Sequence, residues 1–375
     1  MPDFEPNASK PIGLGLTRRP VWWFFGVAAC WVLLNVAISS GTSPVGLVEQ
    51  AQMIAHDLGL RASPPTGVDS TQWPAWRDLR TTTIALVMAL TVVLATYQWS
   101  GYSRVISSMV AAGSITARTS VDRTRLTKEI RAANTWIRRS RHARWFVLVF
   151  AATAAGLVYV GQRYFFIGDN TDQVWWVTAF TPNTWVYLLV GFVGIYIVTM
   201  QNIVGCRIIF AFWRIQRRKI AHFGADLLNQ DGVWGWAAVR LILGVTYAEI
   251  VVHGVGLLAA VPSVPSTPLA LLVIAVPSIE WSITMVIYLI VPVTLITRGI
   301  ARFKIAQFAG TADSDRGSMR YDMTIAARVD RVNAVPPLPF IRWWSGVFYV
   351  VGNLANIFSL LGLLAVFRNE ETWPF

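Results

Sequence analysis

Residues 235–261 read GWAAVRLILGVTYAEIVVHGVGLLAAV, and Arg240, Glu249 and His253 are the only Arg, Lys, Asp, Glu or His side chains among them. A helix that crosses the hydrocarbon core of a bilayer needs roughly 20 mostly apolar residues, so we expect this stretch to span a membrane. Six more stretches have the same character: 21–39, 82–100, 145–161, 185–204, 268–297 and 344–366. The sequence therefore predicts an all-α, polytopic transmembrane helix bundle of about seven spans.

The first of these stretches, 21–39, also has features of a secretory signal peptide, because basic residues precede it and small residues end it. Its length, its tryptophans (Trp22, Trp23 and Trp31) and the six spans that follow favour an uncleaved helix. The whole chain is then one integral membrane domain.

Lysine and arginine predict the orientation of the spans, since both residues are enriched in short cytoplasmic connections. With the amino terminus inside, the segments 1–20, 101–144, 205–234 and 297–343 hold 26 of the 32 Lys and Arg residues, and the outer segments hold five. We therefore expect a cytoplasmic amino terminus, an external carboxyl terminus and a location in the cytoplasmic (inner) membrane.

The overall composition agrees with a membrane protein. The chain is 54% hydrophobic and 14% charged, whereas soluble domains carry about 25% charged residues. The two cysteines, Cys30 and Cys206, cannot form a disulfide framework or a zinc ribbon. The net charge of +12 lies at the ends of spans, where it meets anionic lipid headgroups, so nucleic acid is not an expected partner. The clearest lipid-facing basic cluster is Arg214, Arg217, Arg218 and Lys219.

Three connections are long enough to carry structure of their own. The external loop 40–81 has an amphipathic helical pattern, and 297–343 is a basic cytoplasmic loop. The basic cytoplasmic loop 101–144 predicts a helix that begins after Thr119, with Asp122 placed as in a capping box. One face of this helix is apolar (Leu126, Ile130, Ala133 and Ile137). We expect it to lie on the membrane or pack against 297–343; a surface for a cytoplasmic protein partner, or a homo-oligomer contact elsewhere, is the alternative.

Polar side chains within the spans are the candidate functional residues, because an ionisable group at the bilayer centre costs about 3 kcal/mol on insertion scales. Glu249 and Glu280 are equally far from the turn 262–267, which predicts a matched depth near the midplane, and His253 lies one turn from Glu249. Asn353 and Asn356 share a face of the last span. Burial disfavours the charged form of a carboxyl group, and a second carboxyl nearby disfavours it further, so these residues would form an ion or proton pathway.

Other interpretations of the same residues stay open. They would also serve as hydrogen bonds between helices, and Glu249, His253 and Glu280 together could supply three metal ligands of an intramembrane enzyme. An enzyme is not the favoured class, since the chain has neither a GxxxxGK[ST] nor a GxSxG motif and its four histidines are scattered. We expect no cofactor.

Residues 222–236, HFGADLLNQDGVWGW, resemble the H-P-D-G-x-G-G-L signature of uncharacterised multi-pass membrane proteins of bacteria; Asp231, Gly232 and Gly235 match it. The resemblance implies a bacterial membrane protein and no particular activity. Physically, Asp231 precedes a predicted helix, where a carboxylate caps free N–H groups. A site of ion access formed with His222 and Asp226 is the alternative.

The sequence thus favours a channel or a transporter-like protein for protons or small cations. The alternatives are a non-transporting membrane subunit or scaffold that recruits a cytoplasmic partner, and an intramembrane metalloenzyme.

Overall fold

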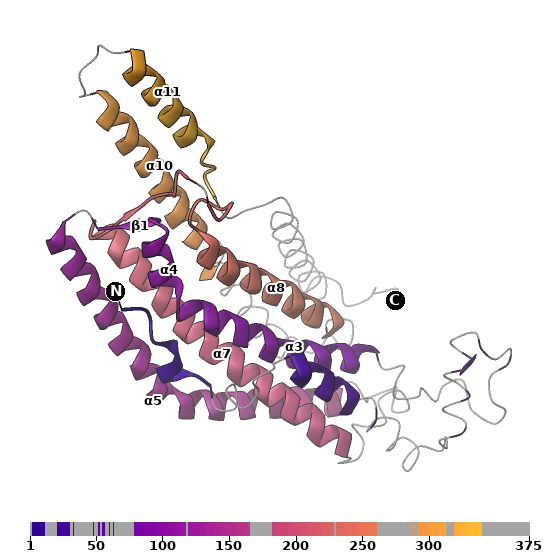
Figure 1. The fold of residues 1–375 in the computed structure, drawn as a ribbon. Coiled ribbons are helices and arrows are strands. Elements are labelled where there is room, and N and C mark those ends of the chain that lie inside the picture. Colours follow the sequence, from indigo (N-terminus) through magenta and orange to yellow (C-terminus); the bar gives the residue numbers. More distant parts are fainter. Residues whose placement is uncertain are drawn as a thin grey trace, which may run out of the picture.

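The computed structural model describes residues 2–11, 21–30, 79–117, 119–165, 182–228, 230–260, 287–288, 291–312 and 319–339, with a few isolated positions between 33 and 63. The described chain is mostly helical (Figure 1). Its longer helices are α3 (Leu79–Tyr102), α5 (Ser120–Phe165), α7 (Pro182–Arg217), α8 (Ala237–Ala260), α10 (Val291–Ala312) and α11 (Met319–Ala334). Shorter elements are η1 (Pro6–Ser9), α4 (Val105–Ala111) and the strands β1 (Ile115–Thr116) and β2 (His222–Phe223).

Three helices in the described part of the chain are long and apolar enough to cross a membrane, over Ala85–Tyr102, Leu188–Arg217 and Ala237–Gly256. They coincide with the predicted spans 82–100, 185–204 and 235–261. Val21–Cys30 forms a shorter apolar helix inside the first predicted span. The predicted span 344–366 and most of 268–297 lie outside the described residues.

Several helices continue well past the predicted limits of the spans. The predicted span 145–161 is the second part of α5, whose 46 residues make a helix about 69 Å long. α7 runs on to Arg217, and α10 runs through the predicted boundary at residue 297 to Ala312. Hydropathy marks the apolar stretch of each helix and not the ends of the helix, because a helix continues beyond that stretch wherever its neighbours bury one of its faces.

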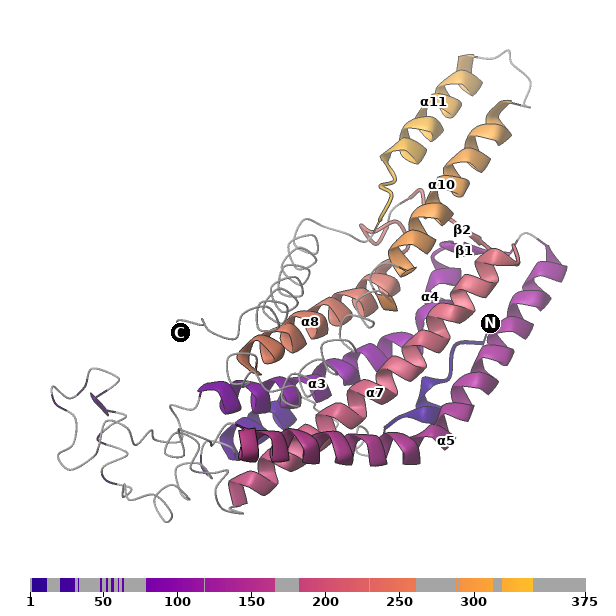
Figure 2. The same cartoon turned by 180° about the vertical axis from the view of Figure 1, so that it is seen from behind.

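α3 is the centre of the body, with α7 and α8 packed against it, and α5 packs along α7 (Figures 1 and 2). Glycines allow α3 to approach both neighbours closely. A Cβ atom at Gly194 of α7 would lie 2.6 Å from the Met88 sulfur, and one at Gly256 of α8 would lie 3.1 Å from Val87 Cγ1. Small residues at helix contacts are what membrane bundles use to gain van der Waals packing.

The connections 103–119 and 218–236 meet at one end of the body, which we call the basic end. β1 and β2 pair in antiparallel fashion there, with Ile115 opposite Phe223. The Gly224 N–H donates to the Ser114 carbonyl at 2.9 Å, and the Trp236 indole N–H donates to the Gly224 carbonyl at 3.0 Å. Two segments far apart in the sequence are therefore held as one small folded unit.

The amino-terminal segment (residues 2–11) also lies at the basic end, against α5. Phe4 is buried and packs edge-on to Phe212 of α7, with ring centroids 5.6 Å apart. Asn134 of α5 accepts a hydrogen bond from the Glu5 N–H and donates one to the Asp3 carbonyl, both at 2.9 Å. The chain's start is thus fixed on the same side as the basic connections.

The Thr119 hydroxyl caps the start of α5 as predicted, but the Asp122 carboxylate bonds this hydroxyl instead of the Thr119 N–H that a capping box would use. The Asp122 N–H donates to the Thr119 hydroxyl at 3.0 Å, and that hydroxyl donates to the Asp122 carboxylate at 2.8 Å. The predicted apolar face (Leu126, Ile130, Ala133 and Ile137) is buried. Its expected partner was wrong, however, because α5 packs on α7 and the amino-terminal segment rather than on the connection 297–343.

The described part of that connection belongs mostly to a helical hairpin. α10 and α11 pack on each other and protrude from the body beyond the basic end (Figures 1 and 2). Arg328 of α11 donates to the Gln307 side-chain oxygen of α10 at 2.5 Å, and Lys304 donates to the Asn333 carbonyl at 3.3 Å. Of the amphipathic helix predicted in 40–81, only isolated helical positions are described.

Candidate functional site

A buried polar cluster lies where α3, α7 and α8 meet. Gln201 of α7 donates from its amide nitrogen to the Gln98 side-chain oxygen of α3 and to the Glu249 carboxylate of α8, the latter at 2.8 Å. The Gln98 amide in turn donates to the Thr246 hydroxyl at 2.5 Å. All four side chains are buried, and Glu249 is only 7% exposed. Each of the three helices that could cross a membrane therefore contributes to the cluster, which we call the glutamate cluster.

The position of the glutamate cluster along its helices can be compared with the nearest arginine toward the basic end, which is Arg207 on α7, Arg240 on α8 and, just past the end of α3, Arg104. Gln98 precedes Arg104 by six residues, Gln201 precedes Arg207 by six, and Glu249 follows Arg240 by nine. At 1.5 Å per residue these spacings are about 9, 9 and 14 Å. Half of a 30 Å hydrocarbon core is about 15 Å, so these spacings are compatible with the depth near the midplane that the sequence predicts for Glu249.

His253 makes a separate contact one turn farther from the basic end. Its Nε2 atom is 2.8 Å from the Thr91 hydroxyl of α3, and that hydroxyl also donates to the Val87 carbonyl at 2.9 Å. The His253 nitrogen is then the donor to the Thr91 oxygen in this arrangement. Glu249 and His253 share a face of α8 as predicted, but each has its own partner on another helix.

Two oxygens of the glutamate cluster have no hydrogen-bond partner among the described residues: Glu249 Oε1 and Gln201 Oε1. On the basic side, the Tyr288 hydroxyl donates to the Gln201 carbonyl at 3.0 Å and packs close to Gly205. An unpaired oxygen of a buried carboxyl group is costly. A proton on Glu249 or a cation beside it would reduce that cost.

Three of the predicted pathway residues, Glu280, Asn353 and Asn356, lie outside the described residues. The main partners of Glu249 were not predicted. Gln98 and Gln201 could have been identified from the sequence, because each is a polar amide inside an apolar stretch. In these helices, however, only the ionisable residues were predicted as site residues.

The basic cluster Arg214, Arg217, Arg218 and Lys219 is divided between several contacts. The Arg214 guanidinium is 3.1 Å from the Glu129 carboxylate of α5, and Arg218 also pairs with Glu129. Arg217 stacks over the Trp213 ring, 4.9 Å from its centroid. At least two of the four side chains therefore join α7 to α5, a role that the sequence did not predict.

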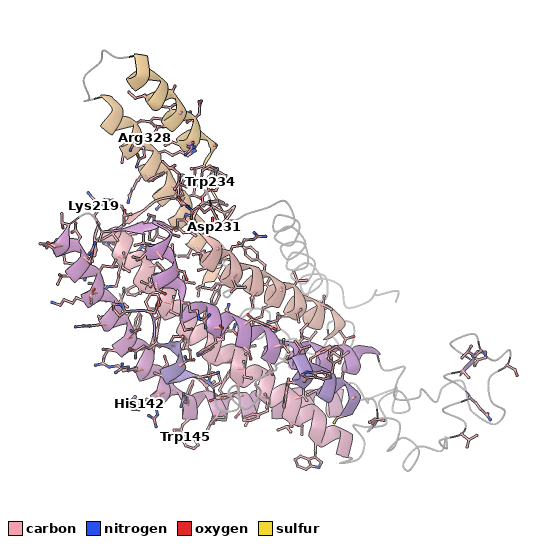
Figure 3. The ribbon with its side chains drawn as sticks, viewed as in Figure 1. His142, Trp145, Lys219, Asp231, Trp234 and Arg328 are labelled. Carbon is pink, nitrogen blue, oxygen red and sulfur yellow. The ribbon has the colours of Figure 1, made fainter. Side chains whose placement is uncertain are left out.

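The signature-like loop before α8 uses its carboxylates for structure (Figure 3). Asp231 accepts hydrogen bonds from the N–H groups of Val233 and Gly235 at 2.9 Å, and from that of Ala237, the first residue of α8, at 3.3 Å. The predicted capping role of Asp231 is confirmed. Asp226 accepts from the Leu228 and Gln230 N–H groups in the same way.

Gly235 has to be glycine in this loop. Its φ is +85°, and an added Cβ atom would lie 2.5 Å from the Ser114 hydroxyl oxygen and 2.9 Å from the Ala112 carbonyl. The match to the glycine of the signature thus has a local physical reason, the close approach of the two basic-end connections.

No group of three His, Cys, Asp or Glu side chains in the described ranges could hold a metal ion. Glu280 lies outside these ranges. An apolar cavity of about 80 Å³ lies between the glutamate cluster and the basic end. Its walls include Tyr102, Met109, Phe212, Phe223 and Trp236.

Comparison with known proteins gives no match: no family model, no curated protein and no solved structure matches this sequence. The function is therefore argued from the sequence and the geometry of the sites.

Proposed function

We propose that this chain is a multi-pass protein of the bacterial inner membrane, with about seven spans and a cytoplasmic basic end, which moves protons or small cations past Glu249. The observation that carries the proposal is the Glu249 carboxyl group. It is buried where three apolar helices meet, and one of its oxygens has no partner among the described residues.

The chemistry of the glutamate cluster suits reversible binding of a positive charge. Gln201 and Gln98 are neutral, and no described Lys or Arg pairs with Glu249. An ionised Glu249 therefore needs a cation from elsewhere, while a neutral Glu249 holds a proton. Exchange between these states at a membrane-embedded carboxyl group is the elementary step of proton or cation transfer. In such a pathway Glu249 is the carrier, and Gln201 and Gln98 orient it.

The predicted orientation is supported by which segments share one end of the body. The amino-terminal segment, the connections 103–119 and 218–236, and the α10–α11 hairpin gather there (Figure 2). All of them belong to segments that lysine and arginine assign to the cytoplasm. An odd number of spans between any two of these segments would have placed them at opposite ends of the body.

Flux through reconstituted protein tests the proposal. Wild-type protein in liposomes, with a pH-sensitive dye inside, is given an imposed proton gradient or potassium diffusion potential. Glu249→Gln keeps the shape of the side chain but cannot carry the charge, so proton or cation flux should fall at least tenfold. The matched control is Thr199→Val, which removes a polar group from α7 two residues from Gln201; among the described residues its hydroxyl bonds only its own helix, at Ile195. Absence of wild-type flux between pH 5 and 8, with and without a voltage, would contradict the proposal.

The second candidate function, a membrane scaffold, is favoured by the protruding α10–α11 hairpin. Ile305 and Phe308, one turn apart on α10, are 68% and 36% exposed, and adjacent exposed apolar side chains on a protruding element are typical of contact surfaces. Site-specific crosslinking from position 306, the exposed neighbour of Ile305, in native membranes tests it. A defined adduct that Ile305→Glu abolishes, in a protein without flux, would favour the scaffold.

A further inference from the structure

The exposed face of α5 changes in character over a single turn. Before the change most of its exposed side chains are charged or polar, as at Lys128, Arg131 and Thr135, and the exposed apolar exceptions include Val121 (56%) and Trp136 (38%). After it they are apolar, with Trp145 and Phe146 each 75% exposed and Val149 66% exposed. His142 and Trp145 mark the two sides of the change and project together from the outer surface of α5 (Figure 3).

Three cationic or imidazole side chains at this change have no partner among the described residues. Arg138 pairs with Glu5, and Arg144 donates to the Lys10 carbonyl at 2.6 Å, so both are used to hold the amino-terminal segment. Arg139, Arg141 and His142 are exposed and make no side-chain hydrogen bond or ion pair with any residue the structure describes. No contact with the described part of the chain therefore competes with an external ligand for them.

The order of residues along α5 matches the order of layers in a bilayer surface. Tryptophan is enriched at the boundary of the hydrocarbon core, and arginine one turn farther out meets the phosphate groups of anionic lipids. Large apolar side chains that are two-thirds or more exposed are disfavoured in water and favoured against lipid tails.

We propose that Arg139, Arg141 and His142, above Trp145, form a binding surface for anionic phospholipid headgroups, and that the hydrocarbon core begins between His142 and Trp145. This inference rests on the proposed membrane location of the chain. The part of α5 from Ser120 to Arg138 then stands outside the lipid headgroups, together with the amino-terminal segment that packs on it.

One consequence concerns the cluster that the sequence assigned to lipid. Glu129, which pairs with Arg214 and Arg218, precedes Trp145 by 16 residues, or about 24 Å of helix. A headgroup layer is only about 5–8 Å thick on each side. In this proposal Arg139 and Arg141, instead of Arg214 and Arg218, are the arginines that contact lipid headgroups.

Lipid titration tests the surface directly. Phosphatidylglycerol or phosphatidylcholine is added to the full chain in detergent, and bound lipid is counted by native mass spectrometry. Arg139→Gln with Arg141→Gln should weaken phosphatidylglycerol binding about fivefold per arginine, about 25-fold together, and leave phosphatidylcholine unchanged. The matched control is Arg123→Gln with Arg125→Gln, which removes the same charge from exposed positions of α5 far from Trp145. Equal loss in the control, or equal affinity of wild type for both lipids, would overturn the proposal.

An accessibility scan tests the boundary without changing any arginine of the surface. Single cysteines replace Thr135, His142 and Val149 in a Cys30→Ser, Cys206→Ser background, and a membrane-impermeant maleimide is applied to inverted vesicles. Positions 135 and 142 should react and position 149 should not. Reaction at 149, or protection at 135 from both sides of the membrane, would refute the boundary. Reaction at 135 and 142 only from the opposite side would support the boundary on α5 and reverse the orientation in the proposed function.

Discussion

Gln201→Leu is the change that most directly probes the glutamate cluster. Leucine is close to glutamine in size, so the substitution removes the amide while keeping most of the packing. Gln201 donates both to Gln98 and to Glu249, and the substitution leaves both buried acceptors without that donor. At about 0.6–1.5 kcal/mol for each lost bond, the free energy of unfolding should fall by about 1–3 kcal/mol.

A triple variant of the glutamate cluster should be more stable than the single variant. Replacing Gln98, Gln201 and Glu249 together by leucine removes donors and acceptors alike. Because exchanging both partners of a buried hydrogen bond for apolar groups is nearly neutral, the triple variant should be more stable than Gln201→Leu alone and close to the wild type. It should carry no flux.

Stability is measured on purified protein in one detergent, by chemical unfolding followed with circular dichroism, and Thr199→Val serves as the control in the same helix. The stabilising role of the Gln201 hydrogen bonds is refuted if Gln201→Leu has the same free energy of unfolding as the control and the wild type. It is also refuted if the triple variant loses the sum of the single losses, since that would show that each side chain acts through packing alone.

Three further outcomes are expected. Reporter domains fused after residues 120 and 320 should be cytoplasmic and those fused after 65 and 172 external; one reversed reading breaks the seven-span arrangement. Asp231→Ala should lower the free energy of unfolding by about 1–2 kcal/mol through loss of the α8 cap, whereas Asp231→Asn should retain most of it, measured by thermal melting. Glu129→Gln should cost about 0.5–1 kcal/mol, because Arg214 and Arg218 are one-third and one-half exposed and screened by water; the loss should shrink in 0.5 M salt, and a loss independent of salt would contradict an ionic contact.

Local properties of the chain were readable from the sequence. The apolar stretches 82–100, 185–204 and 235–261 located α3, α7 and α8, although α7 continues to Arg217, because the hydropathy of a stretch depends on its own residues and not on its neighbours in space. The Thr119 and Asp122 cap and the Asp231 cap were also predictable, since each satisfies N–H groups within a few residues of itself.

What only the tertiary structure decided was how these helices meet. Glu249 was identified as a candidate from the sequence, but its contact with Gln201 depends on the rotation of α7 about its axis and on the small residues that bring α3, α7 and α8 together. Arg214 and Arg218 could not be assigned to Glu129 for a similar reason: the spacing of residues predicted the buried face of α5 but not that α7 is the helix that covers it. Composition fixes which segments leave water, whereas the pairing of polar groups between them is set by side-chain packing across helices distant in the chain.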